Sequence, residues 1–585
     1  MYESSCLRLT ESGIMKKIQI YCENDRAFHQ VEAGESLMSI SGQGFSTIRD
    51  QKSGEEMPVL AALVDHKLKE LEYNILFPQR IEFIGYNHPD GRRTYIRSLC
   101  FVLQNAVREL YPDKILCIDY ALPSGLYCEI RDRIPADDGK PSVHYITDDE
   151  IAVIKARMQA AIDRDLPFSK VKMSAEDAEK LFMENGQKDK ALLLRSLGKF
   201  VYSVYFLDGK ADTFYGPLVP STGYLRNFDI IGFNNGFCLQ YPVEGTASRL
   251  LPLKRQSLIA ATLKEHSDWC HIIGVHGVGT LNGAILKGEA KNLINLSEAR
   301  HERLYAAIAD KIYGRRGQVK IVFIAGPSSS GKTSTSKRLA LQCKVLGLNP
   351  KVIELDNYFV NREDTPKDEN GDYDFESLQA LDLNLLNTQL NDLLSGKPVE
   401  IPTFNFREGK REYNGDFMQL GEKDILIMEG IHALNPAMTS AVDNSRIFRV
   451  YASALTSLSL DETNNISTSD NRLLRRMIRD NRVRGITPED TILRWHSVRR
   501  GENRNIFPFQ ENADAVFNSA HIFELPMLKY YAEPLLRRIA PNSPAYTEAT
   551  RLLKFLEYIV ALSPDEIALI PPTSIMREFI GGQSL

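Results

Sequence analysis

The chain lacks closely spaced cysteines. Its eight cysteines are spread over 585 residues, and no two of them form the C-x-x-C pair that is typical of zinc clusters and redox motifs. Neither a disulfide framework nor a structural zinc site is therefore predicted. Isolated cysteines suit a reducing compartment, so we expect a cytoplasmic protein.

Long uncharged apolar runs are also missing. No stretch approaches the roughly 20 apolar residues that span a bilayer. The first residues, MYESSCLRLTESG, have neither the basic block nor the apolar block of a signal peptide. We expect no membrane partner and no export. Met15, followed by KKIQIYCEN, is a candidate second start, because the strand-like pattern begins there.

A strong excess of one charge is absent as well. The formal net charge is -5 and the pI is near 6.2, which argues against a chain built mainly to coat nucleic acid. RNA is a possible local partner but is not predicted from the composition. We expect a homo-oligomer, whose size the sequence does not fix.

The length favours several domains, because one hydrophobic core rarely organises so long a chain. Short β-type runs such as IQIYC and RIEFIGY predict a small α+β domain over residues 15–85. A long amphipathic helix and further strands predict a second domain over 86–245. Residues 246–315 look like a connector with one helix, LSEARHERLYAAIADKIYG, closed by Gly314.

The region from 316 to 585 alternates apolar strand-like runs with helices. Each run is too apolar to be half exposed, which indicates a parallel sheet covered on both faces. The fold class is therefore a multidomain α/β protein. Its predicted parallel strands are VKIVFIA, KVIEL, DILIM, RIFRVY and DAVFN.

The sequence GPSSSGKT follows the first of these strands and precedes a helix. Glycines permit a tight loop whose N–H groups converge on phosphate oxygens at a helix N-terminus. Lys332 is expected to reach the β- and γ-phosphates, and the Thr333 hydroxyl to bind Mg²⁺. GTPases, motor ATPases and small-molecule kinases all share this loop. The expected nucleotide-binding residues are Gly326, Pro327, Ser328, Ser329, Ser330, Gly331, Lys332, Thr333 and Ser334.

Two acidic residues stand at predicted strand ends. Asp356 follows KVIEL, at the carboxyl edge of the sheet, where ligands bind in such folds. A carboxylate there can accept the proton of an attacking hydroxyl. Glu429 ends DILIM and can hold the metal or its waters. Either residue alone could simply cap the next helix.

Ten arginines fall between residues 472 and 504. Such a run can form a lid that closes over a triphosphate and neutralises charge during transfer. It can also be a solvated helix face or an RNA-binding patch. For Arg479 and Arg484, near the turn at Gly485, we favour a catalytic role.

From residue 319 onward the chain resembles the uridine kinase and phosphoribulokinase family of P-loop small-molecule kinases. GPSSSGKT, LDNYF, YDFESLQALD, GKPVEIPTFNF, MEGI and RLLRRMIRDNRVRG carry the resemblance. It implies ATP and Mg²⁺ as cosubstrates and a ribosyl hydroxyl as acceptor. It also implies that Glu376 and Arg411 face the ribose or base and that Phe404 packs on the nucleobase. Where uridine-cytidine kinases usually carry a base-reading histidine, this chain has Gly409.

The front half has its own likeness. Residues 16–83 resemble a TGS domain, the β-grasp module of threonyl-tRNA synthetase, and about 90–240 resemble that enzyme's editing-type domain. The four metal-binding positions of the editing-type domain are Arg97, Phe101, Phe214 and Leu218 here. Because none of these side chains offers a lone pair at neutral pH, we predict no zinc and no editing activity. We also expect His271 and His276 to be ordinary strand or turn histidines.

Three hypotheses remain open. The leading one is a nucleoside kinase that uses ATP, with uridine or cytidine as acceptor and the front half as scaffold or sensor. The second is an RNA- or translation-associated protein that uses ATP as a switch. The third is a kinase whose acceptor is a sugar phosphate.

Overall fold

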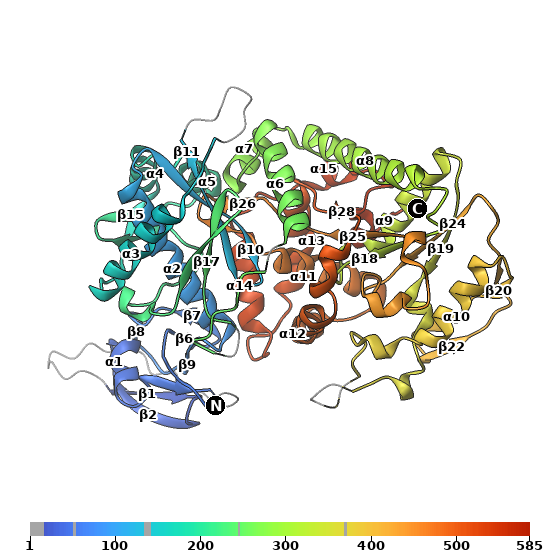
Figure 1. Ribbon diagram of the computed structural model, residues 1–585. Helices are drawn as coiled ribbons and strands as arrows, with labels where there is room; N and C mark the ends of the chain where they lie inside the picture. Colours follow the sequence, from blue (N-terminus) through green and yellow to red (C-terminus); the bar gives the residue numbers. More distant parts are fainter. Residues whose placement is uncertain are drawn as a thin grey trace.

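The computed structural model describes residues 17–50, 54–133, 142–243, 246–254, 256–367, 371 and 373–585. Figure 1 shows two halves side by side, with the N-terminal sheets in one and the sheet of the C-terminal region in the other. Met15 and residue 245, where domain boundaries were predicted, lie outside the described residues. In the described part of the chain, no helix has both the length and the apolarity needed to cross a bilayer.

The first sheet has the β-grasp arrangement. Its strand order is β2-β1-β9-β6-β7. The central pair β1 and β9 is parallel and the other pairs are antiparallel. Helix α1 (Leu37–Gly42) packs its Leu37 and Ile40 into the core of this sheet. The strands are β1 (Lys17–Cys22), β2 (Ala27–Glu32), β6 (Ala61–Val64), β7 (Lys67–Lys69) and β9 (Arg80–Ile84).

The second part is α+β. Helix α2 (Pro89–Leu110) is almost wholly buried against two antiparallel sheets, of order β10-β11-β17-β16 and β13-β14-β15. Helix α3 (Asp148–Asp163) begins with a capping box between Thr147 and Glu150. The other main elements are β10 (Lys114–Leu122), β11 (Gly125–Asp132), β13 (Ser169–Ser174), α4 (Ala175–Glu184), α5 (Lys188–Leu197), β14 (Val201–Leu207), β15 (Lys210–Asp212), β16 (Asp229–Phe233) and β17 (Gly236–Gln240).

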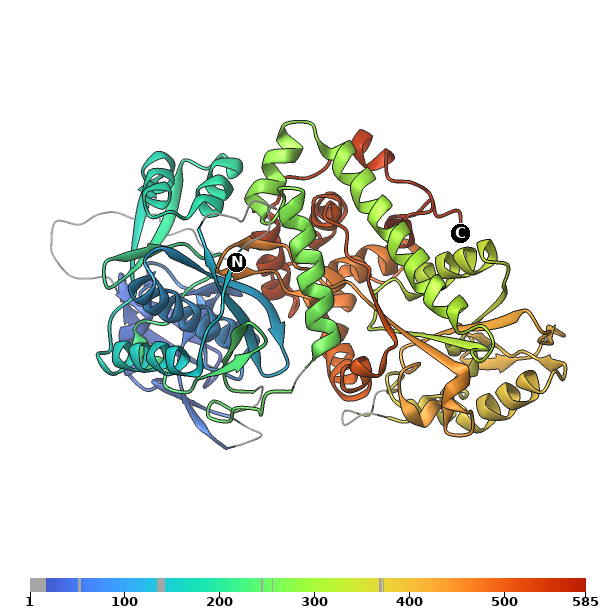
Figure 2. The same ribbon diagram turned by 45° about the horizontal axis from the view of Figure 1, so that its top comes forward.

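Three helices connect the halves, where the sequence predicted one. They are α6 (Ser257–Ile272), α7 (Val278–Leu286) and α8 (Ala290–Gly314), drawn in green in Figure 2, where the long helix α8 runs across the C-terminal half. Helix α8 ends at Gly314, where the sequence predicted the end of the connector helix. His271 lies in the last turn of α6, so its expected place in a strand or turn was wrong.

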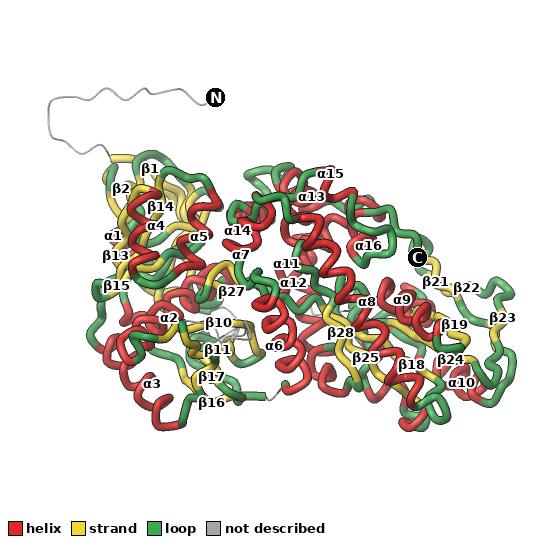
Figure 3. The backbone as a smooth tube through the Cα atoms, turned by 90° about the horizontal axis from the view of Figure 1, so that it is seen from above, coloured by secondary structure: helices red, strands yellow, loops and turns green. Residues whose placement is uncertain are grey.

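The C-terminal sheet has the order β19-β24-β18-β25-β28, and all its pairs are parallel. All five predicted strands are present, and the predicted fold class is confirmed. Figure 3 shows these strands with α8 and α9 packed nearby. The strands are β18 (Ile321–Ala325), β19 (Asn349–Glu354), β24 (Asp424–Glu429), β25 (Ile447–Ser453) and β28 (Ala515–Asn518). The main helices are α9 (Lys332–Val345), α10 (Leu383–Leu394), α11 (Thr468–Arg479), α12 (Pro488–Asn505), α13 (Glu524–Leu536), α14 (Tyr546–Leu556) and α16 (Met576–Ile580).

The central strand explains why the sheet is covered on both faces. Val322 and Ile324 of β18 point into one core, which is shared with α8, α9, α11 and α13. Ile321 and Phe323 point into the other core, which is shared with α10. Alternate side chains of a strand face opposite sides, so a fully apolar strand needs two covering layers. Strand β18 lies between β24 and β25, and its carboxyl end is therefore the crevice where such sheets bind ligands.

A hairpin joins the two halves. Strands β26 (Ser459–Asp461) and β27 (Asn464–Asn465) leave the C-terminal half and reach the N-terminal half. The fully buried Lys190 of α5 is ion-paired with Asp212 and lies 3.5 Å from Asp461 of this hairpin. The N–H of Ile118 donates to the carbonyl of Glu462 at 2.8 Å. Buried charge and backbone pairing thus fix the hairpin between the halves.

Candidate active site

The loop Gly326–Gly331 connects the central strand β18 to helix α9, and the first residues of α9, Lys332–Ser334, continue the phosphate-binding sequence. Its backbone takes conformations that suit glycine, with φ +83° at Gly331 and +58° at Ser329. A Cβ atom at Gly326 would collide with the backbone oxygen of Ala452 on the neighbouring strand. The loop is therefore bent tightly against the sheet, as a phosphate-binding loop requires.

Side chains from other elements donate hydrogen bonds to three carbonyl groups of the loop. Arg472 donates to the Ser328 carbonyl at 3.0 Å, Arg475 to the Ser329 carbonyl at 3.4 Å, and the Ser519 hydroxyl to the Ser330 carbonyl at 2.6 Å. In a trans peptide the N–H points opposite to the C=O. Holding these carbonyls turns the following N–H groups toward the inside of the loop.

Two buried ion pairs fix the arginines that hold the loop. Arg472 is paired with Glu502, and Arg475 with Glu524, and all four side chains are almost fully buried. Glu502 also accepts the N–H of Ser328 at 3.1 Å. One interpretation of the sequence placed the arginines of this run in a lid, but Arg472 and Arg475 support the loop. Their spacing on α11 places them on one stripe of the helix with Arg476 and Arg479.

Thr333 and Glu429, the two residues predicted to bind Mg²⁺, are in contact with each other. Strand β24 ends at Glu429, whose Oε1 accepts the Thr333 hydroxyl at 2.6 Å. Burial raises the pKa of Glu429 to about 7, although nearby Lys332 lowers it. A buried carboxylate and hydroxyl at a helix N-terminus are the hard oxygen ligands that Mg²⁺ prefers. The residues present therefore fit the cation that the loop implies.

Asp356 lies in the 3₁₀ turn Leu355–Tyr358 that follows β19. Burial raises the pKa of its carboxyl, while Lys332 and Arg484 lower it. The same electrostatic environment includes Glu429, because Asp356 contributes to the raised pKa of that residue. Asp356 thus belongs to the charged group around the Lys332 ammonium, at the carboxyl edge of the sheet.

Glu376 also belongs to this charged group. Burial raises its pKa to about 7, with further influence from Glu502, Arg476, Lys332 and Asp356. Its Oε2 is buried and has no hydrogen-bond partner, so it is free to receive a ligand hydroxyl. A Cβ atom at Gly501 would lie 2.7 Å from the Glu376 Cγ, so only glycine allows this approach.

Sequence reasoning missed Arg476. Its guanidinium donates to the Ser328 hydroxyl at 2.8 Å and interacts electrostatically with Glu376. It lies 3.3 Å from the buried carboxylate of Asp480. Asp480 also pairs with Arg479 at 2.8 Å and Arg484 at 3.4 Å. The four-residue spacing of Arg476, Asp480 and Arg484 could have shown this cluster.

The predicted base-binding residues lie in an aromatic cluster beside Asp356. Phe404 on β21 (Thr403–Asn405) is buried, with ring centroids 5.6 Å from Phe359 and 5.1 Å from Phe406. Arg411 on β22 (Lys410–Glu412) donates to Asp382 and to the Phe359 carbonyl, each at 3.0 Å. Arg411 therefore braces the cluster, and its expected contact with the ribose or base stays a prediction.

The side chain of Arg362 fills the space beside Gly409. Its φ is +69°, and a Cβ there would lie 2.7 Å from Nε and 2.8 Å from Cβ of Arg362. Arg362 also donates to the Phe406 carbonyl at 2.8 Å. A histidine at 409 would have to displace Arg362, so this loop is built for glycine.

The four residues that the resemblance places at an editing-type metal site lie in the same region of the N-terminal half. The rings of Phe101 and Phe214 lie 5.3 Å apart, and Leu218 is in the same core. Arg97 is buried and donates to the Pro217 carbonyl at 2.6 Å. Across the described residues, no group of three or more His, Cys, Asp or Glu side chains is arranged for a metal ion.

The two histidines singled out in the sequence make ordinary contacts. His271 bonds to the Ser267 carbonyl at 2.8 Å, and burial lowers its pKa to about 4. His276 lies 2.9 Å from Asp189, and the two imidazole rings are stacked.

Comparison with known proteins divides the chain in the same way. Residues 321–524 match the Phosphoribulokinase / Uridine kinase family. A uridine kinase of Macrococcus caseolyticus (strain JCSC5402) is 31% identical over 198 residues, which are 34% of this chain and 86% of that enzyme. A threonine–tRNA ligase of Desulforamulus reducens is 29% identical over 179 residues, and that similarity falls in the N-terminal region.

These likenesses are partial. The match to the threonine–tRNA ligase covers 30% of this chain and only 27% of the ligase. A solved structure, of a possible uridine kinase from Bacillus stearothermophilus, is 16% identical and covers 34% of this chain and 89% of that one, with a TM-score of 0.23. The fold class therefore rests on the strand order and not on that superposition.

Proposed function

The chain belongs to the phosphoribulokinase and uridine kinase family, and we propose that it transfers the γ-phosphate of ATP to the 5′-hydroxyl of a nucleoside. One observation carries the proposal. Glu429 accepts the hydroxyl of Thr333 in the phosphate-binding loop at 2.6 Å, and Lys332 of that loop opposes the effect of burial on the pKa values of three carboxyl groups, those of Asp356, Glu376 and Glu429. An ATPase switch needs the loop and Glu429 but has no use for the other two.

Each residue has a role in this proposal. Lys332 and the loop N–H groups bind the β- and γ-phosphates. Asp356 orients the acceptor hydroxyl and takes up its proton; the transition state is loose, so placing the oxygen matters more than strong basicity. Arg479 and Arg484, assembled on Asp480, neutralise charge that develops during transfer. Thr333 and Glu429 would hold Mg²⁺, which supplies charge neutralisation on the phosphate oxygens.

In this proposal the acceptor binds on the side of Asp356 that faces away from the ATP phosphates. The unpartnered Oε2 of Glu376 suits a ribose hydroxyl, and the rings of Phe404 and its neighbours suit a nucleobase. The family resemblance makes uridine and cytidine the first acceptors to test.

We assign the other parts of the chain as scaffold or sensor. The β-grasp sheet corresponds to a TGS domain, and the region of α2 and α3 to an editing-type domain without zinc. We propose domain limits of 15–85, 86–245, 246–315 and 316–585. We also propose that the protein forms a homo-oligomer and works in the cytoplasm.

The test is an acceptor panel. Purified protein is incubated with [γ-³²P]ATP, Mg²⁺ and, separately, each common ribonucleoside and ribulose 5-phosphate. We expect a labelled nucleoside 5′-monophosphate from at least one nucleoside. Lys332→Met should abolish it, whereas Lys344→Met, an exposed lysine on the same helix, should not.

The other outcomes separate the alternatives. Labelled product only from the sugar phosphate would keep the kinase and replace the acceptor. ATP hydrolysis without any labelled acceptor, together with a salt-sensitive gel shift on tRNA, would favour the RNA-associated switch, which the similarity of the N-terminal region to threonine–tRNA ligase motivates.

A further inference from the structure

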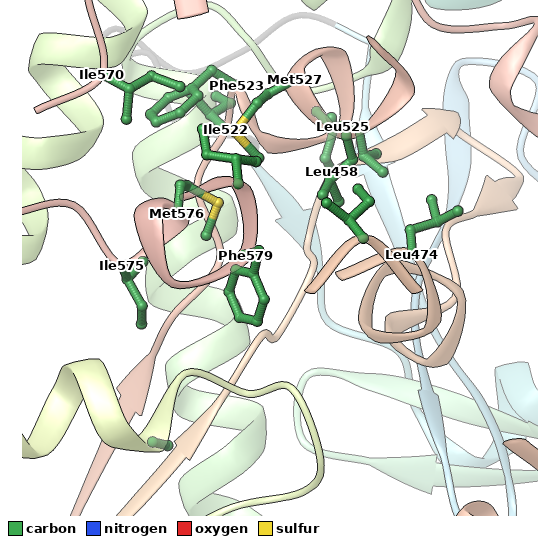
Figure 4. Packing of buried hydrophobic residues seen from close by; sticks show 14 of the residues in the cluster. Leu458, Leu474, Ile522, Phe523, Leu525, Met527, Ile570, Ile575, Met576 and Phe579 are labelled. Atoms are coloured by element: carbon green, nitrogen blue, oxygen red, sulfur yellow. The ribbon is translucent and has the colours of Figure 1, made fainter. Parts of the chain in front are cut away.

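The segment Ser574–Gln583, called the tail segment below, lies against the phosphate-binding loop. It includes helix α16, whose Met576 and Phe579 are fully buried. Figure 4 shows Ile575, Met576 and Phe579 near Ile522, Phe523 and Met527, and all of them belong to one hydrophobic core. The tail segment is thus a packed part of the C-terminal half.

Its acidic residue contacts the loop directly. Glu578 Oε2 accepts the N–H of Ser334 at 3.3 Å and the Ser334 hydroxyl at 2.6 Å. The Gln583 amide donates to the same hydroxyl at 2.7 Å. Ile575 closes the contact from the side, because a Cβ at Gly331 would collide with it.

The donors that Glu578 uses are donors that a nucleotide needs. Ser334 is the third residue of α9, and the first N–H groups of a helix have no partner within the helix. In a phosphate-binding loop these N–H groups receive phosphate oxygens. One N–H cannot serve a carboxylate and a phosphate fully at once, and two anions at this distance repel each other.

We propose that the tail segment competes with the nucleotide for the N-terminus of α9, so that Glu578 must leave Ser334 before ATP binds in full. This inference rests on the proposed use of the loop for a nucleotide. Without nucleotide, the protein is then held in a closed state. Its apparent affinity for ATP is the intrinsic affinity multiplied by the fraction of molecules in which the tail segment has moved.

The arginine run connects this gate to the transfer site. Arg482 donates to the backbone carbonyls of Glu578 at 3.0 Å and Phe579 at 3.1 Å. It lies two residues from Arg484, which we place at the phosphates. A movement of this turn toward bound phosphate shifts both arginines together and pulls on the tail segment.

The first test measures nucleotide binding without an acceptor. Glu578→Ala and Glu578→Gln are titrated with ATP and Mg²⁺ by isothermal calorimetry. We expect the Kd to fall about tenfold, within the range of about 5- to 150-fold that is typical of coupling between sites. Glu533→Gln, which removes the charge of a partly exposed glutamate on α13 that is paired with Arg537, should leave the Kd unchanged. Unchanged or weaker binding in both Glu578 variants would overturn the proposal.

The second test uses the unaltered protein, so it holds even if the variants fold poorly. Hydrogen–deuterium exchange is followed in a peptide covering residues 575–583, with and without ATP and Mg²⁺. We expect faster exchange with nucleotide, because the tail segment is released. Slower exchange would mean that the segment is a wall of the nucleotide site and would refute the gate. Neither test needs a nucleoside acceptor, so a failed acceptor panel leaves this inference separately testable.

Discussion

Removing the charge of Glu502 should destabilise the C-terminal half strongly. Glu502 is fully buried and pairs with Arg472, whose guanidinium donates to it at 2.8 Å through Nη2. It also accepts from Arg499 at 2.9 Å and from the Ser328 N–H at 3.1 Å. In Glu502→Gln the Arg472 charge stays buried without compensation, which costs about 3–5 kcal/mol.

Tryptophan fluorescence provides a local assay. The chain has two tryptophans, and the ring of Trp495 lies 5.3 Å from the Arg472 guanidinium. In a Trp269→Phe background, urea unfolding followed by fluorescence reports the surroundings of Trp495. This matters because a multidomain chain need not unfold in one step.

A double variant separates charge from packing. Arg472→Met/Glu502→Gln removes both buried charges, so it should recover at least half of the lost stability. Glu489→Gln on the same helix is the matched control and should behave like the wild type. If Glu502→Gln unfolds within about 0.5 kcal/mol of the wild type, the argument that this pair supports the loop fails.

The same pair predicts a pH dependence. Burial alone would raise the pKa of Glu502, but Arg472 outweighs it and holds the pKa below its ordinary value of 4.5. A depressed folded-state pKa stabilises the protein at pH values above the unfolded pKa, and this contribution is lost as the pH falls below it. Urea midpoints of the wild type should therefore drop in acid more steeply than those of Glu502→Gln.

Three further predictions concern the site. Arg484→Ala should lower kcat about 100- to 1,000-fold with ATP affinity nearly unchanged, and Arg494→Ala should not; equal effects in steady-state kinetics would remove Arg484 from the transfer step. The pKa of Glu376 is raised to about 7, so the KM for the acceptor should fall as the pH rises through 7, and the profile should be flat in Glu376→Gln. An identical profile in both proteins would contradict that role. Elemental analysis of the full-length protein should find no stoichiometric zinc, and one zinc per chain would overturn the interpretation of Phe101 and Phe214.

The C-terminal sheet could be predicted because its strands are apolar on both faces. Ile321, Val322, Phe323 and Ile324 are all fully buried, so the sequence pattern and the burial agree. The connector could not be predicted in full. Helices α6 and α7 pack mainly against distant parts of the chain, and α7 is short and contains Gly279 and Gly283, which weaken its helical signal.

Part of the site could be predicted from the sequence for a similar reason. Lys332, Thr333, Asp356 and Glu429 follow strands of one parallel sheet, and such strand ends meet at one edge. Contacts between remote segments have no local signature. Ser334 and Glu578 are 244 positions apart, so no spacing rule joins them.

The arginine run shows a second limit. The orientation of α11 against the sheet decides which arginines of the run support the loop and which ones stay on its solvent side. Arg472 and Arg475 find buried acidic partners on other elements, whereas Arg484 is largely exposed. The composition of the run alone does not distinguish these two kinds of arginine.

The central claim is that Asp356 acts on the acceptor and not on ATP. Single-turnover transfer of phosphate from ATP to the accepted nucleoside, measured beside ATP binding, tests it directly. In Asp356→Asn we expect the transfer rate to fall at least about 1,000-fold while the Kd for ATP stays within about threefold, and Asp392→Asn, an exposed control, to match the wild type. Transfer at the wild-type rate in Asp356→Asn would contradict the account.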